Sequence, residues 1–369
     1  FSVLLQRRGM AKPGEKIVAR QEMCRYMVDC LQTAGAAKSH AEQLADVLIE
    51  ADVRGHYSHG LNRLEMYVNN LLEKSCLGEG EPEILNERAG TAWVDGRNLL
   101  GPVVGNFCID LAVKKAKEAG IGWVSAKGSN HFGIAGWYSM RAMRDGGCIG
   151  MAFTNTSPLM YPTRAAKPAL GTNPISLAAA GRDGDTYVLD MATTTVAIGK
   201  VELASRKGEK VPSTWGADAK GKVSTNPDEI VKEGALLPLG GDEVQGGYKG
   251  YGMASLVEIF CGVLAGAHWG PNIRRWGSNS AEADLGQCFV AIDPKAFAPG
   301  FNDRMQDFMD TMRGLPRSDE SQPVEVAGDM ERRHEDLVHD LGGIPYHPNQ
   351  IDFANTLAAR LKIAPPKTL

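Results

Sequence analysis

The cysteines of this 369-residue chain lack the spacing of a disulfide framework or a zinc site. There are seven of them, scattered from Cys24 to Cys288 without a single Cys-x-x-Cys pair. We therefore expect reduced, mostly buried thiols in an intracellular protein. The histidines also lack metal spacing, because His56 and His59 stand three residues apart with no third ligand near them. The sequence thus predicts no metal centre.

Long apolar runs and a strong net charge are also absent. The longest apolar run, residues 256–269, contains Glu258 and is too short to span a bilayer. A net charge of -4, with 23% charged and 43% hydrophobic residues, excludes strongly basic, disordered and collagen-like chains. We expect neither nucleic acid nor membrane as a partner, and a chain of this length can bury the core of more than one domain.

The first residues have an unusual composition. The first methionine is Met10, and two arginines but no acid precede Glu15, which suits the end of a cleaved transit peptide. A leader or tag explains the same residues. We place residues 1–9 outside the fold and expect a cytoplasmic protein, with a mitochondrial location as the alternative.

The hydrophobic spacing divides the chain into three parts. Residues 17–74 follow a helical pattern, in which Ser39 and Glu42 form a capping box at the start of the second helix. Strands and helices then alternate too irregularly for βαβ repeats, which predicts a mixed sheet. The chain is therefore α/β. We expect a helical domain built from both chain ends, residues 10–77 and 301–369, with the C-terminal helices packing back on the N-terminal domain, and a mixed-sheet domain over 78–300.

Individual elements follow from the same patterns. Strands are predicted at residues 83–85, 91–94, 121–126, 148–154, 175–179, 186–189 and 287–292. Helices are predicted at residues 104–119, 135–144, 195–205, 251–265, 303–312, 331–340 and 349–361.

The first motif that carries chemistry is Ser58-His59-Gly60, followed by Arg63 and Tyr67. A helix starting near Gly60 would place His59, Arg63 and Tyr67 on one face, four residues apart. Arg63 could hold a carboxylate in two parallel hydrogen bonds, and its charge disfavours protonation of His59. The alternative is that Arg63 pairs with Glu65 or another acid and His59 caps a helix.

The second motif is the stretch from Gly128 to Tyr138, between a predicted strand and a predicted helix. His131 stands there among small residues that let a ligand approach, which suits general acid/base work. The alternative is a structural histidine, which is the usual role of a lone histidine on a loop. Further on, Asp190 ends an apolar strand, where it could bind ribose hydroxyls, orient a histidine or cap a helix.

Short polar residues and glycines form the remaining candidates. The segments Thr154-Asn155-Thr156-Ser157-Pro158 and Gly171-Thr172-Asn173-Pro174 suit recognition of amides or hydroxyls, but also ordinary turns. The glycine-rich loop Gly246–Gly252 opens a helix and carries Lys249, which favours phosphate. The loop is neither a Walker A motif nor a Rossmann fingerprint, so a dinucleotide would require a non-Rossmann fold.

Taken in order, these motifs resemble the type 2 malate/L-lactate dehydrogenases, which include ureidoglycolate and sulfolactate dehydrogenases and some cyclic imine reductases. The resemblance covers about residues 17–350. It is carried by Ser58-His59-Gly60 with Arg63, Asn130-His131 with Gly133, Gly171-Thr172-Asn173-Pro174, Asp190-Met191-Ala192-Thr193 and Lys249-Gly250-Tyr251-Gly252. It implies an oxidoreductase that interconverts small 2-hydroxy and 2-oxo acids with NAD or NADP, on a non-Rossmann nucleotide-binding domain in a homodimer.

The resemblance also assigns roles. His131 corresponds to the proton acceptor from the substrate hydroxyl and Arg63 to the holder of its carboxylate, with His59 and Tyr67 lining the same pocket. The positions that resemble nucleotide contacts are Thr156, Asp190, Met191, Ala192, Lys249, Gly328, Asp329 and Met330. A 2'-phosphate on the ribose would require a nearby cationic side chain, and Arg164, Lys167 and Arg182 are the candidates.

Three readings of function follow. The first is a dehydrogenase acting on malate and oxaloacetate or on lactate and pyruvate. The second is the reduction of a cyclic imine 2-carboxylate on the same fold. The third is a catalytically silent nucleotide-binding protein with a structural role.

Overall fold

The computed structural model describes residues 11–275, 277–278 and 281–369, so the expectation for residues 1–9 falls outside the described residues. The chain divides into two compact units, and each is described by itself. The first unit contains the residues up to Gly80 together with Met309–Leu369, and the second is Glu81–Phe308.

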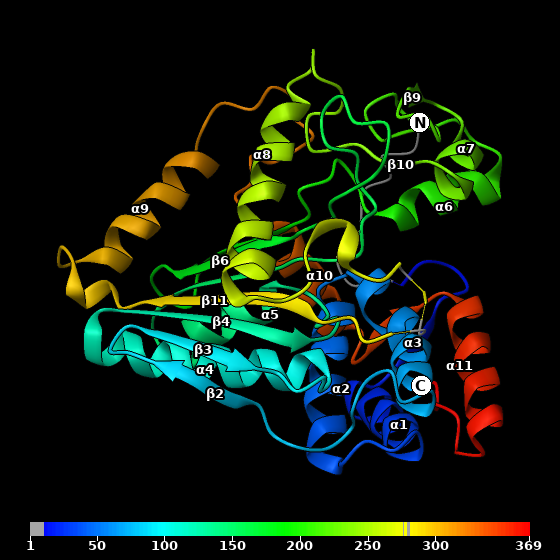
Figure 1. The fold of residues 1–369 in the computed structure, drawn as a ribbon, viewed down its shortest axis with the longest axis horizontal. Coiled ribbons are helices and arrows are strands. Elements are labelled where there is room, and N and C mark those ends of the chain that lie inside the picture. Colours follow the sequence, from blue (N-terminus) through cyan, green and yellow to red (C-terminus); the bar gives the residue numbers. More distant parts are fainter. Residues whose placement is uncertain (1–10, 276, 279–280) are drawn as a thin grey trace. The chain divides into compact units, whose positions relative to one another are not determined.

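Helices make up most of the first unit (Figure 1). From the N-terminal part come α1 (Arg20–Thr33), α2 (Lys38–Val53), a 3-10 helix (Tyr57–His59) and α3 (Leu61–Leu72); from the C-terminal part come α10 (Asp329–Asp340) and α11 (Pro348–Leu361). The helical pattern predicted for residues 17–74 is confirmed, but the capping box is wrong. The N-cap of α2 is Ala37, and Ser39 lies inside the helix, because the Ala37 amide already binds the Gly78 carbonyl at 2.9 Å.

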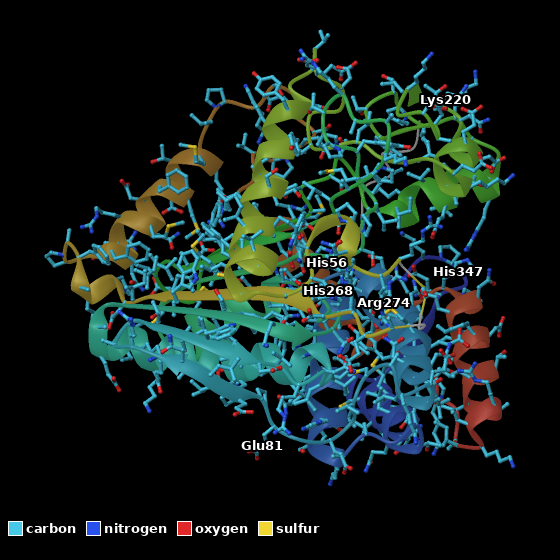
Figure 2. The ribbon with its side chains drawn as sticks, viewed as in Figure 1. His56, Glu81, Lys220, His268, Arg274 and His347 are labelled. Atoms are coloured by element: carbon cyan, nitrogen blue, oxygen red, sulfur yellow. The ribbon has the colours of Figure 1, made fainter. Side chains whose placement is uncertain are left out.

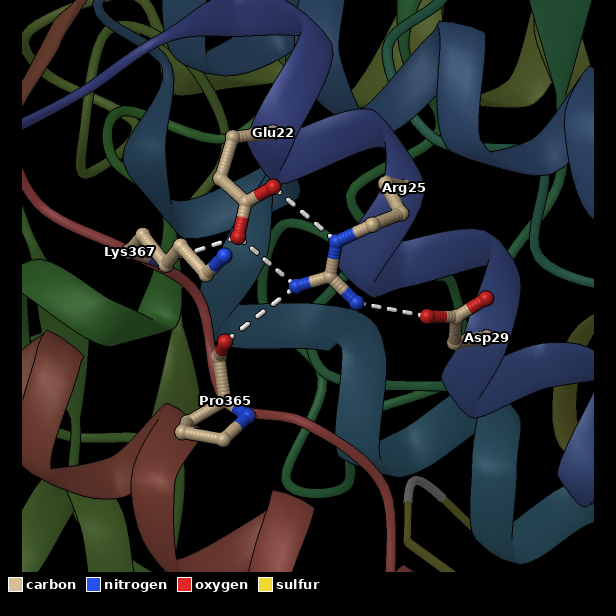
Figure 3. A network of polar contacts seen from close by, with 5 residues as sticks. All are labelled: Glu22, Arg25, Asp29, Pro365 and Lys367. Atoms are coloured by element: carbon tan, nitrogen blue, oxygen red, sulfur yellow. Dashed lines mark hydrogen bonds and ion pairs between the residues drawn. The ribbon is translucent and has the colours of Figure 1, made fainter.

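Segments from the N-terminal and C-terminal parts of the described chain meet in this first unit. A strand that the sequence did not predict, β1 (Lys16–Val18), pairs antiparallel with β12 (Ile344–Tyr346). The Tyr26 hydroxyl donates to the Ala354 carbonyl at 2.8 Å. Figure 3 shows a further link, in which Arg25 bonds to the Pro365 carbonyl and Glu22 accepts from the Lys367 amide. These contacts hold residues 344–367 against the N-terminal helices.

A seven-stranded sheet forms the centre of the second unit, in the order β2-β3-β4-β11-β5-β6-β7. Its strands are β2 (Glu83–Glu87), β3 (Thr91–Asp95), β4 (Ile121–Ser129), β5 (Ile149–Thr154), β6 (Ile175–Ala180), β7 (Thr186–Met191) and β11 (Leu285–Ile292). All neighbours are antiparallel except β3 and β4. The predicted mixed sheet and all of its predicted strands are confirmed.

Helices cover both faces of this sheet (Figure 1). On one face lie α4 (Gly101–Ala119) and α5 (Gly136–Arg144), so close that a Cβ on Gly122 would come within 1.9 Å of the Ala112 carbonyl oxygen. On the other face, α8 (Gly247–Glu258) continues into a π-helical turn (Ile259–Val263). There Val257 and Cys261 pack against Phe153, Cys288 and Val290 of the sheet.

The rest of the second unit was only partly predicted. It contains α6 (Ile198–Lys207), α7 (Pro227–Lys232) and a small sheet of β8 (Gly216–Ala217), β9 (Val223–Ser224) and β10 (Ala235–Leu236). The helix α9 (Phe301–Arg313) runs across the division between the units. All seven cysteines are free and six are buried, as expected. In the described part of the chain, no helix combines the length and apolar character needed to cross a bilayer.

Candidate active site

The loop before His131 is fixed by side-chain amides from three parts of the second unit. It begins where β4 ends, and the Asn130 side chain donates to Asn98 Oδ1 and to the Leu99 carbonyl, both at 2.9 Å. Gln287 in β11 donates from Nε2 to the Asn130 carbonyl, also at 2.9 Å. Asn130 and Gln287 are both buried, so water competes little for these bonds. The backbone entering His131 is therefore held on both sides.

The residues after His131 are fixed by an aromatic pair. Phe132 stacks on Tyr138 with ring centroids 4.6 Å apart, and the Tyr138 hydroxyl donates to the Phe132 carbonyl at 2.5 Å. The first residue of α4, Gly101, lies against the loop, because a Cβ there would come within 2.2 Å of the His131 carbonyl oxygen. His131 thus stands on a short, rigid connection between strand and helix.

The His131 ring has a defined polarity. Its Nδ1 accepts a long hydrogen bond of 3.3 Å from the Gly133 amide, which leaves Nε2 as the nitrogen that carries the proton in this arrangement. The side chain is half-buried. To accept a proton at Nε2, the ring must move its own proton to Nδ1 and give up this bond, at a cost of about 0.5–1.5 kcal/mol. Proton exchange at Nε2 would therefore require the bond between Nδ1 and the Gly133 amide to open.

Asp190 at the end of β7 caps the helix that follows His131. Its Oδ2 accepts from the amide of Gly136, the first residue of α5, at 2.7 Å. A carboxylate at a helix N-terminus is stabilised by the unpaired amides and the helix dipole. Asp190 therefore does cap a helix, which was one of the expected alternatives. The same bond connects β7 to the start of α5, just after the His131 loop. Met191 and Ala192 follow it, both half-buried.

The two segments of short polar residues come together around Thr156. Its amide donates to Asn173 Oδ1 at 3.2 Å, and its hydroxyl accepts from the Thr172 amide at 2.9 Å. A Cβ on Gly171 would lie 1.9 Å from Thr156 Oγ1, so only glycine allows this approach. Segments fifteen residues apart in the chain thereby form one polar surface of backbone and hydroxyl groups.

Glu258 holds this polar surface in place, a role that the sequence did not reveal. Its Oε1 accepts from Asn155 Nδ2 at 2.8 Å and from the Gly270 amide at 3.0 Å, while Oε2 accepts from Asn173 Nδ2 at 2.7 Å. The carbonyl of His268, labelled in Figure 2, accepts from Asn155 as well. Glu258 is 5% exposed, so this buried charge is offset by bonds that connect α8 to Asn155 and Asn173. An acid inside an apolar run was the available signal.

The N-terminus of α8 offers room for an anion. Gly246 is its N-cap, with φ at 94° and no capping side chain. A Cβ added to Gly246 would meet nothing closer than Lys249 Cδ at 4.0 Å. The exposed Lys249 ammonium lies 5.9 Å from the Tyr248 ring centroid. The Gly247 and Lys249 amides already donate to the Asp242 and Gly246 carbonyls, so the open approach and the lysine are the features that suit a phosphate group.

The first unit carries the row from His59 to Tyr67. The expected common helix is wrong for His59, which ends the 3-10 helix, whereas Arg63 and Tyr67 lie in α3. The Ser58 hydroxyl lies 2.9 Å from His59 Nδ1. Burial and the charge of Arg63 lower the pKa of His59 to about 4, as expected from its neighbour. Tyr67 is buried at 1% exposure.

The alternative partner of Arg63 is engaged elsewhere. Glu65 lies 3.0 Å from the Arg360 guanidinium of α11. Pairing with Glu65 therefore does not account for Arg63, because Glu65 pairs with Arg360.

The segment Gly328-Asp329-Met330 opens α10. Gly328 is the N-cap, with φ at 101°, and Met330 is 66% exposed. Asp329 forms a two-pronged pair with Arg313, at 2.9 and 2.6 Å, and also accepts from the Val326 amide. Burial raises the pKa of Asp329, but these bonds outweigh it and the net pKa is lowered. The Asp329 carboxylate is therefore engaged by Arg313 and Val326, and the exposed side chain here is that of Met330.

No group of three or more histidines, cysteines and acids suited to a metal ion occurs among residues 11–275, 277–278 and 281–369. The polar groups described above include amides, hydroxyls, a lysine and an arginine, and the carboxylates of Asp190, Glu258 and Asp329 already accept hydrogen bonds from the protein. This donor set suits an organic ligand with phosphates.

Comparison with known proteins identifies the family. The family model described as malate/L-lactate dehydrogenase matches residues 18–353. The malate dehydrogenase of Pyrococcus abyssi is 35% identical over 349 residues, covering 94% of this chain and 95% of that protein. Among solved structures, malate dehydrogenase from Pyrococcus horikoshii has a TM-score of 0.88 at 32% identity, covering 97% of this chain and 99% of that one. For malate dehydrogenase from Entamoeba histolytica the TM-score is 0.89 at 30% identity, with 96% and 100% covered. The chain therefore belongs to the malate/L-lactate dehydrogenase family and is a dehydrogenase.

Proposed function

We propose that this dehydrogenase interconverts a small 2-hydroxy acid and the corresponding 2-oxo acid with NAD or NADP. Malate with oxaloacetate is the first pair to test, because relatives named malate dehydrogenase are 35% identical. Lactate with pyruvate is the second pair. The observation that carries the proposal is the rigid seating of His131, whose loop is held by Asn130, Gln287 and Tyr138.

The division of labour follows from what the reaction needs. The bound nicotinamide would supply or accept the hydride. Reduction of the 2-oxo acid also needs a proton on the carbonyl oxygen, and oxidation removes it again, so His131 would exchange this proton at Nε2. Arg63 would hold the substrate carboxylate in two parallel hydrogen bonds. His59 would line the pocket as a neutral ring, because its pKa of about 4 keeps it unprotonated at neutral pH. Tyr67 completes the proposed set.

The second unit has groups that fit a dinucleotide. The N-terminus of α8 with Lys249 would receive the phosphates, and the open space at Gly246 supports this. The backbone around Thr156 and the segment Asp190–Ala192 offer acceptors and donors for ribose and amide groups. In the first unit, the backbone of Gly328 and Asp329 and the exposed side chain of Met330 are proposed as further contacts.

The choice between NAD and NADP is part of the proposal to be tested. Relatives carry both names: a (2R)-3-sulfolactate dehydrogenase (NADP(+)) of Chromohalobacter salexigens and a ureidoglycolate dehydrogenase (NAD(+)) of Escherichia coli, each 32% identical. Of the candidate cations, Arg164 is held by Glu243 in two bonds of 2.8 and 2.6 Å, and Arg182 lies 3.8 Å from Asp303. Either pair would have to open to bind a 2'-phosphate. A comparison of kcat/KM with NADH and NADPH decides the question.

Steady-state kinetics of His131→Ala and Arg63→Ala test the assignment. Loss of a positioned acid/base group should lower kcat by about 10²–10⁴-fold in His131→Ala. Arg63→Ala should raise KM for the 2-oxo acid, and Arg63→Lys should recover little, because lysine cannot form the planar pair of bonds. Arg360→Ala is the control, since it removes a surface arginine that bonds to the side chains of Glu65 and Asn69. Undiminished turnover in His131→Ala, or unchanged KM and rate in Arg63→Ala, would overturn the assignment.

A cyclic imine 2-carboxylate is the second candidate substrate. A Delta(1)-pyrroline-2-carboxylate/Delta(1)-piperideine-2-carboxylate reductase of Pseudomonas putida is 30% identical over 83% of this chain. Arg63 would hold the carboxylate of either substrate class in the same way. Assays of oxaloacetate, pyruvate and a cyclic imine in parallel, with NADH and NADPH, distinguish the candidates. Because the chain is a dehydrogenase, the third interpretation, a catalytically silent nucleotide-binding protein, no longer applies.

A homodimer completes the proposal. Along α8 and its π-helical turn, Leu256, Ile259 and Val263 are exposed by 42%, 53% and 56%, at the spacing of one helix face. A second copy of the chain would cover this apolar stripe. Light scattering of the wild type and of Ile259→Asp measures the molar mass in solution. A dimeric wild type that Ile259→Asp converts to a monomer supports the proposal, and a monomeric wild type refutes it.

A further inference from the structure

Asp52 is a buried carboxylate beneath the Ser58-His59-Gly60 turn. It lies in α2, is 0% exposed, and accepts two hydrogen bonds at Oδ2. One comes from the Leu61 amide, at the first residue of α3, at 3.0 Å. The other comes from the Tyr346 hydroxyl of β12 at 2.7 Å. One oxygen thereby joins α2, α3 and the C-terminal strand.

The other carboxylate oxygen faces the turn itself. A Cβ on Gly60 would lie 1.9 Å from Asp52 Oδ1, so the backbone of Gly60 rests directly on this oxygen. Oδ1 is buried and has no hydrogen-bond partner among the described residues. The contact therefore fixes the position of the turn by shape, while Oδ2 fixes it by hydrogen bonds.

We propose that Asp52 is a positioning residue for the substrate clamp, acting through the Leu61 amide and Gly60 on the placement of Arg63 and His59. The inference rests on the proposed function of Arg63. The connection is short: the Arg63 amide donates to the Gly60 carbonyl at 2.8 Å, within the turn that Asp52 holds. The α3 helix has no side-chain cap from its own N-cap residue, which is glycine, so Asp52 supplies that function from another helix.

A purely structural cap would not need a buried charge. Asparagine or serine accepts from an amide at a smaller desolvation cost than aspartate. Burial raises the pKa of Asp52 to about 7, although the bonds from Tyr346 and the Leu61 amide act in the opposite direction. An ionised acceptor binds an amide more strongly than a neutral one. The hydrogen bond from the Leu61 amide to Asp52 should therefore strengthen, and hold the start of α3 more firmly, as the pH rises through about 7.

Other titratable groups face Asp52 from the surrounding elements. The 3-10 helix contributes Tyr57 and β12 contributes Tyr346, and burial raises the pKa of both. His59 ends the same 3-10 helix, next to Gly60, and its pKa is about 4. None of these three changes charge near pH 7. From α10, His334 contacts the Tyr57 hydroxyl at 3.2 Å and the Val53 carbonyl at 2.8 Å. A His334→Gln variant measures its share of any pH effect.

The test combines kinetics with amide exchange. In Asp52→Asn, KM for the 2-oxo acid should rise about tenfold while KM for the nicotinamide cofactor stays the same, because misplaced clamp atoms weaken substrate binding. Below about pH 7 the wild type should approach the Asp52→Asn value, and the variant should show no such dependence. Tyr346→Phe removes a bond that lowers the pKa of Asp52, so its KM transition should move to higher pH.

Asp46→Asn is the matched control, since it makes the same change at an exposed position of the same helix and should leave both KM values unchanged. Amide hydrogen exchange measures, without any turnover, how firmly Asp52 holds the start of α3. Amides there should exchange faster in Asp52→Asn than in the wild type. Unchanged KM and pH profile in Asp52→Asn, with a lower melting temperature as its sole effect, would overturn the proposal. A wild type that turns over no 2-oxo acid refutes the proposed function instead, and the exchange result then stands alone.

Discussion

Gln287 and Asn130 are joined by one hydrogen bond that links the central strand of the sheet to the loop of His131. Nε2 of Gln287 donates to the Asn130 carbonyl at 2.9 Å, and Gln287 is 0% exposed. β11 lies between β4 and β5, in the middle of the seven-stranded sheet. His131, the proposed proton exchanger, is therefore positioned by a residue 156 places further along the chain.

Gln287→Met should separate this positioning from folding. Methionine is similar in volume and removes the donor, which leaves the Asn130 carbonyl unsatisfied at about 1–3 kcal/mol. We expect kcat to fall at least about tenfold, because a small displacement of His131 weakens proton transfer. Turnover at saturating substrate and thermal melting measure the two effects. Equal kcat in variant and wild type would show that the loop keeps its position without Gln287.

Asp190 caps α5 and is also proposed to contact the cofactor, and two variants separate these two roles. Asp190→Asn keeps an oxygen for the Gly136 amide, whereas Asp190→Ala removes it and should destabilise α5 by about 1 kcal/mol. If Asp190 also contacts the nucleotide through its charge, KM for the cofactor should rise in both variants. Titration of NADH or NADPH by fluorescence, beside thermal melting, gives both quantities. Cofactor affinity that falls in Asp190→Ala alone would mean that the cap is the whole role.

Glu258 offers a test of the polar surface around Thr156. Glu258→Ala should be strongly destabilising, by about 3 kcal/mol or more, since three buried donors lose their acceptor. Glu258→Gln keeps one acceptor and should fold. We expect Glu258→Gln to weaken cofactor binding about tenfold through the released Asn173 and Thr156, with kcat less affected. Binding calorimetry measures the affinity, and an unchanged Kd would confine Glu258 to a structural role.

The sequence predicted most elements of the fold because their patterns are local. Alternating and short apolar runs located all seven strands of the large sheet, and helical spacing located α10 and α11. The pair β1 and β12 was missed, since each has three residues and exists through a partner more than 320 residues away. The cap of α2 was assigned to Ser39 by its motif, but the tertiary bond from Ala37 to Gly78 decided where the helix begins.

The candidate site was predictable where a residue acts by its own chemistry. His131, Arg63 and Lys249 stand out by type and by their neighbours in the chain. Asp52 did not, because an acid in a helical pattern is ordinary until burial and distant partners are known, and Glu258 was visible only as an acid inside an apolar run. Their partners Tyr346 and Gly270 come from other elements. Positioning residues are therefore the part of a site that requires tertiary structure.

The contacts between Arg25 and Glu22 predict how the first unit responds to acid (Figure 3). The Arg25 hydrogen bonds lower the pKa of Glu22 to about 2, with a further contribution from the Lys367 amide. Because the folded pKa lies below the ordinary value of 4.5, this stabilisation is complete above about pH 4.5 and disappears as the pH falls toward 2. Solvent screening of the half-exposed pair limits the loss to about 1 kcal/mol.

Glu22→Gln removes the titrating group, so the difference in unfolding free energy between wild type and variant should shrink as the pH falls through this range. Arg25→Met should produce the same shrinkage, because Arg25 is the main cause of the lowered pKa. Lys38→Met is the control: its 3.7 Å pair with Glu42 is highly exposed and should leave the pH dependence unchanged. Urea denaturation followed by circular dichroism at a series of acid pH values measures these differences. Stability curves of wild type and Glu22→Gln that run parallel from neutral to acid pH would contradict the assignment, because a paired carboxylate must lose its contribution when it is protonated.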